Sequence, residues 1–214
     1  MPRTLKSTSN NAALYTFDAE QRAQFGMLCG VDEAGRGPLC GPVCCAAVIL
    51  DPEDPIEGIN DSKKLTEKRR EALFEEIIKR AVAYKVVFIS PQEIDERNIF
   101  WATMDGMTQA VEGLEPQPQY VLIDGNRCPP ELKLPARAVV KGDANSASIA
   151  AASILAKVSR DRYMKELDSQ YPQYQLAKHK GYPTVLHYQL IEQYGIQPFY
   201  RRSFLKKQGY WHEK

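Results

Sequence analysis

Beyond residue 26, the hydrophobic positions of the chain follow a strand-like pattern and then alternate between helical and strand-like spacing. Apolar runs over 27–32 and 43–50 are separated by a turn rich in glycine and proline. This arrangement predicts two neighbouring strands, possible partners in a hairpin. The second run is almost continuously apolar, which is typical of a strand buried on both faces.

Helices and strands alternate through the rest of the chain. Ser90-Pro91-Gln92-Glu93 is a capping box with proline at the first helical position, so a helix is predicted to begin near Pro91. Thr184 is placed to cap a last long helix that ends near Tyr194. The other elements that the spacing predicts are helices over 66–82 and 147–167 and strands over 84–89, 120–123 and 138–140.

These elements predict one α/β domain with a five-stranded mixed sheet, flanked by helices and followed by a helical C-terminal appendage. Residues 1–26 are polar and lack periodicity, so they are expected to form a loosely ordered N-terminal extension. The folded domain is expected to span 27–205, with a tail over 206–214.

Composition favours an ordinary soluble protein. The 214 residues are 43% hydrophobic and 26% charged, enough to bury a sizeable core. No apolar run reaches the roughly 18 residues of a membrane span, and the N-terminal segment is polar rather than signal-like. We therefore expect a cytoplasmic protein without a membrane partner, and a monomer by default.

The net charge of +1 gives no support for a nucleic-acid partner. Local clusters of basic residues matter more, because the fold can join them into one surface. The alternative is that each pair lies on a solvated helix face. The clusters are Lys63-Lys64, Lys68-Arg69-Arg70, Lys178 with Lys180, Arg201-Arg202 and Lys206-Lys207.

The five cysteines are odd in number and lack the paired spacing of a zinc site. Four of them lie in one apolar region, where small apolar side chains suit a strand. We therefore expect free thiols, with redox sensitivity left open for Cys40 beside the glycine turn.

Acidic residues follow three separate predicted strands: Asp32-Glu33, Asp124 and Asp143. Carboxylates that converge at one edge of a sheet can hold two divalent ions about 4 Å apart, which activate water and stabilise the leaving oxygen in phosphodiester cleavage. One such acid is as easily a helix cap or a surface ion pair, but four in this arrangement favour a metal centre for Mg²⁺ or Mn²⁺.

Asp32 and Glu33 present a difficulty, because neighbouring side chains in a regular strand point to opposite faces. Two solutions are open. A bulge or strand end near Gly35 would re-aim one carboxylate, or Glu33 would serve the second metal or a water.

Other acids and motifs have simpler explanations. Asp61, Asp95 and Asp161 are expected to cap helices or form ion pairs. Cys40 stands where a dinucleotide-binding fingerprint needs its third glycine, and neither a P-loop nor a zinc-binding H-E-x-x-H occurs. His187 is expected on a helix surface.

Two loops suit a phosphate backbone. Gly35-Arg36-Gly37 combines a cation with glycines that let the backbone approach a ligand closely. In the second loop, 178–184, Tyr182 could stack on a sugar or a base. Its simpler alternative is a tyrosine half-buried against the helix that follows.

Taken together, these motifs resemble the bacterial ribonuclease HII family, the type 2 ribonucleases H, from about Met27 to Phe204. The resemblance rests on six segments in the family's order: 31–38 (VDEAGRGP), 60–65 (NDSKKL), 123–125 (IDG), 141–143 (KGD), 151–157 (AASILAK) and 179–182 (HKGY).

The resemblance implies a ribonuclease H-like fold and cleavage of the RNA strand in RNA/DNA hybrids. It also implies nicking 5′ of ribonucleotides embedded in duplex DNA, leaving 3′-hydroxyl and 5′-phosphate ends, and a role in ribonucleotide removal. By motif position, Asp32, Glu33, Asp124 and Asp143 take the places of the family's catalytic carboxylates. Asp32, Glu33 and Asp124 would bind a first metal without substrate, and Asp143 would complete a second site with substrate.

The resemblance also implies roles in substrate binding. The backbone of Gly35, Arg36 and Gly37 would read the 2′-hydroxyl that distinguishes RNA from DNA. Tyr182 would pack on the adjoining nucleotide's sugar. Phosphates would be held by Ser62, Lys63 and Lys64.

Two rival functions use the same residues differently. A DNA-directed nuclease or integrase would share the carboxylates without needing to read a 2′-hydroxyl. A non-catalytic module that binds hybrids would fit the basic loops, but it leaves the four acids unexplained because carboxylates repel phosphates.

Overall fold

A mixed five-stranded sheet forms the centre of the protein. The computed structural model describes residues 5–207 and 209–210. Neighbouring strands follow the order β3-β2-β1-β4-β5, in which β3–β2 and β2–β1 are antiparallel and β1–β4 and β4–β5 are parallel. The strands are β1 (Leu28–Ala34), β2 (Val43–Ile49), β3 (Ala83–Ile89), β4 (Tyr120–Asp124) and β5 (Ala136–Val139). The predicted hairpin, fold class and mixed sheet are confirmed.

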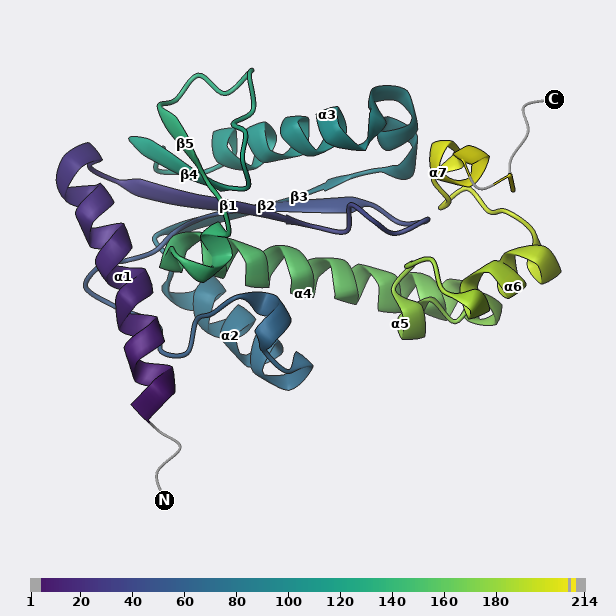
Figure 1. Cartoon of the computed structure of the whole chain (residues 1–214), viewed down its shortest axis with the longest axis horizontal. Helices are drawn as coiled ribbons and strands as arrows, with labels where there is room; N and C mark the ends of the chain where they lie inside the picture. The colour runs from purple at the N-terminus through teal and green to yellow at the C-terminus, as the bar shows by residue number, and fades with distance from the viewer. Residues whose placement is uncertain (1–4, 208, 211–214) are drawn as a thin grey trace.

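Helices cover both faces of this sheet, as Figure 1 shows. α3 (Pro91–Glu112) lies on one face, while α4 (Ala147–Gln170) lies on the other with α2 (Glu67–Arg80) packed against it. The capping box at Ser90 and Glu93 is present, and Thr66 caps α2 through a bond from the Arg69 amide. β2 is buried along its whole length, as its apolar run predicts.

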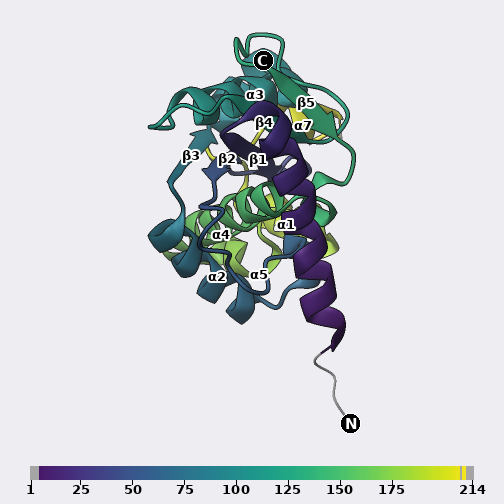
Figure 2. The same ribbon diagram turned by 90° about the vertical axis from the view of Figure 1, so that its left-hand side faces the viewer.

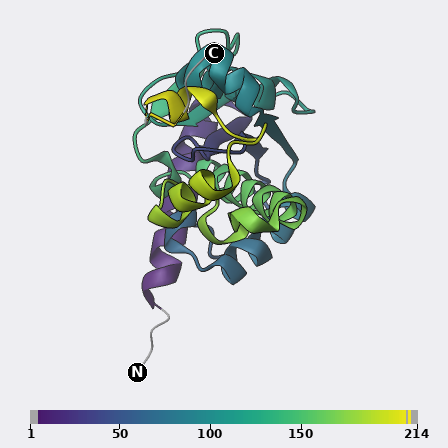
Figure 3. The ribbon, with the colours of Figure 1, turned by 90° about the vertical axis from the view of Figure 1, so that its right-hand side faces the viewer.

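The C-terminal part of the chain forms a helical layer at one end of the molecule (Figure 3). It contains η3 (Pro172–Tyr174), α5 (Leu176–His179), α6 (Val185–Tyr194) and α7 (Arg202–Lys207). The predicted helix ending near Tyr194 corresponds to α6, which Thr184 caps. Of the tail expected over 206–214, residues 208 and 211–214 lie outside the described part of the chain, and α7 runs into its start.

The prediction of an irregular N-terminal segment is wrong for residues 5–25, which form the helix α1 (Leu5–Phe25). Figure 2 shows α1 running along the side of the molecule that faces the viewer. Leu14 and Asp18 are buried, and the Phe25 ring stacks on Tyr120 with centroids 4.0 Å apart. Aromatic stacking and burial therefore hold α1 against the sheet.

Two short turns lie close to the ends of the strands. η1 (Ser62–Lys64) precedes α2, and η2 (Gly142–Ala144) joins β5 to α4. The predicted strand over 138–140 ends at Val139, so Asp143 lies in η2 rather than at a strand end. Within the described residues, no helix is both long and apolar enough to cross a membrane.

Candidate active site

The sheet and η2 bring the four predicted acids together. Asp32 and Glu33 are in the last three residues of β1, and Asp124 ends β4. β1 and β4 are parallel with Val31 opposite Ile123, so Asp32 and Asp124 emerge side by side. The Gly142 amide donates to the Asp124 carboxylate at 2.6 Å, which brings η2, and with it Asp143, to the same edge.

Burial and neighbouring carboxylates raise the pKa of three of the acids. Burial raises the pKa of Asp32 well above its usual range, and the charges of Glu33 and Asp124 add to this. Burial also raises the pKa of Glu33 and of Asp143, each with a contribution from Asp124. Concentrated negative charge therefore makes this edge of the sheet unfavourable for anions and favourable for cations.

The strand through Asp32 and Glu33 is regular. Pairing of β1 with β2 runs without interruption from Gly30–Val48 to Ala34–Cys44. No bulge interrupts this pairing, but the strand ends at Ala34, directly before Gly35. Within the strand the two side chains leave the sheet on alternate faces. The Ser153 hydroxyl bonds Asp32 from α4, whereas Glu33 pairs with Arg36 at 3.4 Å.

Basic side chains lie against the acids. The Lys63 ammonium is 3.7 Å from the Asp143 carboxylate, and although partial burial opposes the shift, nearby acids raise its pKa. Lys64 pairs instead with Asp61 at 3.7 Å. Ser62 is buried, and its hydroxyl bonds that of Ser153 at 2.9 Å. The η1 turn thus stands directly over the acidic edge.

The donor set fits hard divalent cations. It consists of carboxylate oxygens, the ligands that Mg²⁺ and Mn²⁺ prefer. Two of the carboxylates already form ion pairs, Glu33 with Arg36 and Asp143 with Lys63. Among residues 5–207 and 209–210, no group of three or more His, Cys, Asp or Glu side chains is arranged so that it could hold a metal ion. Binding a metal would therefore require these carboxylates to exchange their present partners for the cation.

The glycine loop, residues 35–41, lies beside this edge. Its backbone is hydrogen-bonded to two segments that are distant in the sequence. The Leu39 amide donates to the Gly181 carbonyl, while the Gly41 amide donates to Phe199 and the Arg201 amide to Leu39. An added Cβ at Gly37 would stand 3.8 Å from the Tyr182 ring. Tyr182 is 42% exposed, so its ring borders an open surface next to the loop.

Two buried arginines, which no sequence motif indicated as part of the site, shape this loop. The Arg201 guanidinium donates to the carbonyls of Gly35, Arg36, Pro38 and Gly41. Arg160 on α4 donates to Cys40, Pro42 and Lys180, which joins the glycine loop to the Tyr182 loop. Arg201 is 0% exposed, so it belongs neither to a basic surface nor to a solvated helix face.

His187 is also buried, so the prediction of a helix-surface position is wrong. Its ring stacks on His179 with centroids 4.0 Å apart, and its nitrogens contact the Tyr182 carbonyl and the Tyr200 hydroxyl. Burial and the neighbouring His179 lower the pKa of His187 to about 4. A neutral imidazole therefore supports the Tyr182 loop from beneath.

The remaining acids follow their predicted structural roles. Asp161 pairs with Lys157 at 2.8 Å, and Asp95 accepts from the first amides of α7. Asp61 caps η1, and its carboxyl lies close enough to Asp143 to contribute, after burial, to the raised pKa of Asp143. The five cysteines are free, as predicted.

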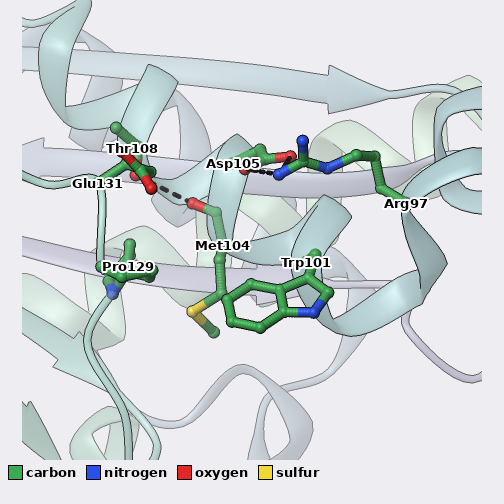
Figure 4. A pocket seen from close by; sticks show the side chains of 8 residues that line it. Arg97, Trp101, Met104, Asp105, Thr108, Pro129 and Glu131 are labelled. Carbon is green, nitrogen blue, oxygen red and sulfur yellow. Dashed lines mark hydrogen bonds and ion pairs between the residues drawn. The ribbon is translucent and has the colours of Figure 1, made fainter.

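The cavity in Figure 4 is separate from the acidic edge. It has a volume of about 310 Å³ and lies between α3 and the segment after β4, where Trp101 and the Arg97–Asp105 ion pair line it. None of the predicted site residues lines it.

Comparison with known proteins identifies the family. The sequence profile of ribonuclease HII matches residues 29–207. The chain is 56% identical to a ribonuclease HII of Vibrio parahaemolyticus over 199 residues, 93% of each chain. It is 59% identical to a ribonuclease HII of Vibrio cholerae over 182 residues, 85% of this chain and 88% of the relative.

Solved structures agree with this match. The crystal structure of ribonuclease H2 from Pyrococcus horikoshii superposes with a TM-score of 0.72 at 31% identity, covering 85% of this chain and 95% of that one. Its fold is the ribonuclease H-like fold that the sequence resemblance implies. The chain therefore belongs to the ribonuclease HII family, and it is an endonuclease that cleaves the RNA strand of RNA/DNA hybrids and serves ribonucleotide removal.

Proposed function

We propose that Asp32, Glu33, Asp124 and Asp143 are the catalytic carboxylates and hold two divalent cations, Mg²⁺ or Mn²⁺. Asp32, Glu33 and Asp124 would take the first cation without substrate, and Asp143 would complete the second site when substrate is bound. The observation that carries this proposal is the convergence of four acids from β1, β4 and η2 with raised pKa values at Asp32, Glu33 and Asp143.

When bound, such cations lower the pKa of the attacking water and offset charge on the leaving oxygen. The protein's part is to hold the carboxylates in place. The Glu33 amide and the Ser153 hydroxyl fix Asp32, and the Gly142 amide fixes Asp124. Although Glu33 leaves β1 on the other face, the strand ends one residue later at Ala34, and the charge of Asp124 contributes to the raised pKa of Glu33, which supports its share in the same metal centre.

Substrate recognition is assigned to the adjoining loops. The backbone of Gly35, Arg36 and Gly37 would read the 2′-hydroxyl, and Tyr182 would pack on the next sugar. Lys63 and Lys64 would hold phosphates from η1. Ser62 would support that turn from within, because its hydroxyl is already bonded to Ser153.

The same proposal extends to the oligomeric state, the domain bounds and the cellular location. All these residues come from one chain, which supports a monomer whose catalytic domain spans 27–205. Duplex DNA with embedded ribonucleotides, the implied substrate, supports a location in the bacterial cytoplasm. Sedimentation of the protein with and without substrate tests the monomer.

The test is cleavage of duplex DNA that contains a single ribonucleotide. Asp124→Asn should lose most of the rate, because a metal ligand is weakened with little change in volume. Its fold should persist, since the amide oxygen can still accept from the Gly142 amide. Asp105→Asn is the matched control, as it neutralises a carboxylate of the separate cavity and should keep wild-type activity.

Omitting divalent metal should abolish cleavage, and an all-deoxy duplex should remain intact. Equal cutting of the deoxy duplex would instead indicate the DNA-directed nuclease. Full activity of Asp124→Asn, with Asp105→Asn unchanged, would refute the assignment of the carboxylates.

A further inference from the structure

Asp18 on α1 is a fully buried carboxyl group that takes no part in the proposed cleavage. Its two oxygens accept three hydrogen bonds, from the Ser146 hydroxyl at 2.6 Å, the Ser148 amide at 2.8 Å and the Ser148 hydroxyl at 2.7 Å. A buried carboxyl is costly unless its oxygens are satisfied in this way. Asp18 therefore makes a directed connection between α1 and the first turn of α4.

The turn η2, which carries Asp143, leads directly into this first turn of α4. Ser146 is the N-cap of α4, with its hydroxyl accepting from the Ile149 amide at 3.2 Å. The Ser146 amide donates to the Gly142 carbonyl at 2.8 Å. Because the Gly142 amide in turn bonds Asp124, a chain of hydrogen bonds runs from Asp18 through η2 to β4.

The same turn of α4 rests on the central strand. A Cβ at Gly30 would collide with the backbone of Ser148, so α4 and β1 are in close contact two residues before Asp32. Further along α4, Ser153 bonds Asp32. The position of α4 thus affects two of the four acids, and Asp18 secures the end of the helix nearer to Asp143.

We propose that Asp18 is a positioning residue, which fixes the first turn of α4 and thereby holds Asp143 against Asp124. The helix α1 then contributes to the geometry of the catalytic site as well as to the stability of the fold. This inference rests on the role proposed for Asp143. The alternative is that Asp18 anchors α1 and affects stability alone.

The test compares Asp18→Asn and Ser148→Ala with Leu14→Ala. In Asp18→Asn, the amide oxygen can still accept from Ser148, but an NH2 group replaces the oxygen that accepts from the Ser146 hydroxyl and the negative charge is lost, whereas Ser148→Ala removes a single donor residue and is the milder change. Leu14 is buried one turn earlier on α1 and offers only apolar packing, so Leu14→Ala weakens the docking of α1 without removing a bond to α4.

The first readout is the Mg²⁺ concentration that gives half-maximal cleavage of the single-ribonucleotide duplex, measured well below each variant's Tm. We expect Asp18→Asn to raise it by about threefold to tenfold, less than the ~10–100-fold typical of a group bonded directly to a metal ligand. Ser148→Ala should shift it in the same direction, and Leu14→Ala should leave it unchanged.

The second readout is amide hydrogen exchange of the metal-free protein. Exchange should speed up over residues 142–149 in Asp18→Asn and Ser148→Ala, and over α1 in Leu14→Ala. Equal Mg²⁺ requirements in all three variants, or unchanged exchange over 142–149, would overturn the proposal. If Asp18→Asn does not fold, Ser148→Ala carries the comparison.

Asp143→Asn separates this inference from the proposed function. An inactive Asp143→Asn with a normal Mg²⁺ requirement in Asp18→Asn would refute the positioning role alone. An active Asp143→Asn would refute the proposed role of Asp143 and, with it, the catalytic purpose assigned to Asp18.

Discussion

At the scale of single residues, the acidic edge is a cost to the metal-free fold. The pKa values of Asp32, Glu33 and Asp143 are raised, chiefly by burial. Between the ordinary carboxyl range near 4 and these raised values, the folded protein binds more protons than the unfolded chain, so its stability falls as pH rises. The repulsion grows as pH rises through this range, and a bound cation would relieve it.

We therefore expect Mg²⁺ to raise the Tm more at about pH 7.5 than at about pH 5, where protons already neutralise part of the cluster. Thermal unfolding with and without Mg²⁺ at both pH values measures this difference. Asp32→Asn is the control and should show a smaller one, because one buried charge is absent. A Mg²⁺ effect of equal size at both pH values would contradict the prediction.

The cysteines show a second residue-scale consequence of burial. Burial raises the pKa of Cys29 and of Cys40 to about 12, and it raises those of Cys44 and Cys45 as well. Thiols react as thiolates, so these four should be inert. A thiol reagent such as DTNB should label only the partly exposed Cys128 in the native protein and all five cysteines in denaturant. Rapid labelling of Cys40 in the native protein would instead support the redox sensitivity left open by its position beside the glycine turn.

At the scale of elements, periodicity located those with an uninterrupted apolar pattern and missed those without one. β2 and α2 were predictable because apolar residues fill their buried positions. α1 was missed because polar Asp18 occupies a buried position, and polar Gln21 a half-buried one, between Leu14 and Phe25. Only the partners of Asp18 on α4, distant in sequence, explain why a polar residue is placed there.

The helix α1 should therefore matter for stability. Deleting residues 1–26 removes Leu14 from the core and leaves the start of α4 without Asp18. We expect a loss of at least about 3 kcal/mol in the free energy of unfolding, the usual scale for one buried leucine. Urea unfolding of the full and truncated chains measures it. An unchanged midpoint would mean that α1 packs only loosely, as the sequence alone predicted.

At the scale of the whole molecule, the recognition surface is assembled from segments far apart in the chain. Short motifs indicated Gly35, Gly37 and Tyr182, because the family resemblance assigns roles to those positions. The arginines that join the segments were missed, since Arg201 and Arg160 bind backbone carbonyls, which carry no sequence signal. Sequence could therefore indicate which residues meet the substrate but not what holds them together.

This assembly predicts different effects for two glycines of one loop. Gly35 has φ +95°, and a Cβ there would collide with the Arg160 guanidinium, so Gly35→Ala should lower the Tm and disturb the whole loop. At Gly37 a Cβ would make only ordinary contact with Tyr182 at 3.8 Å. Gly37→Ala should therefore fold normally and obstruct the surface between the loop and the tyrosine.

The measurements are the Tm and cleavage of duplexes with one ribonucleotide. Gly37→Ala should keep the wild-type Tm within about 2 °C, since surface substitutions usually change stability by less than about 0.5 kcal/mol, yet cleave the ribonucleotide substrate more slowly. Gly195→Ala is a control for strain alone, because Gly195, at the end of α6, has φ +79° with no neighbour within 4 Å of an added Cβ. Normal cleavage by a stable Gly37→Ala would place sugar recognition elsewhere, whereas a selective loss would locate it between the glycine loop and Tyr182.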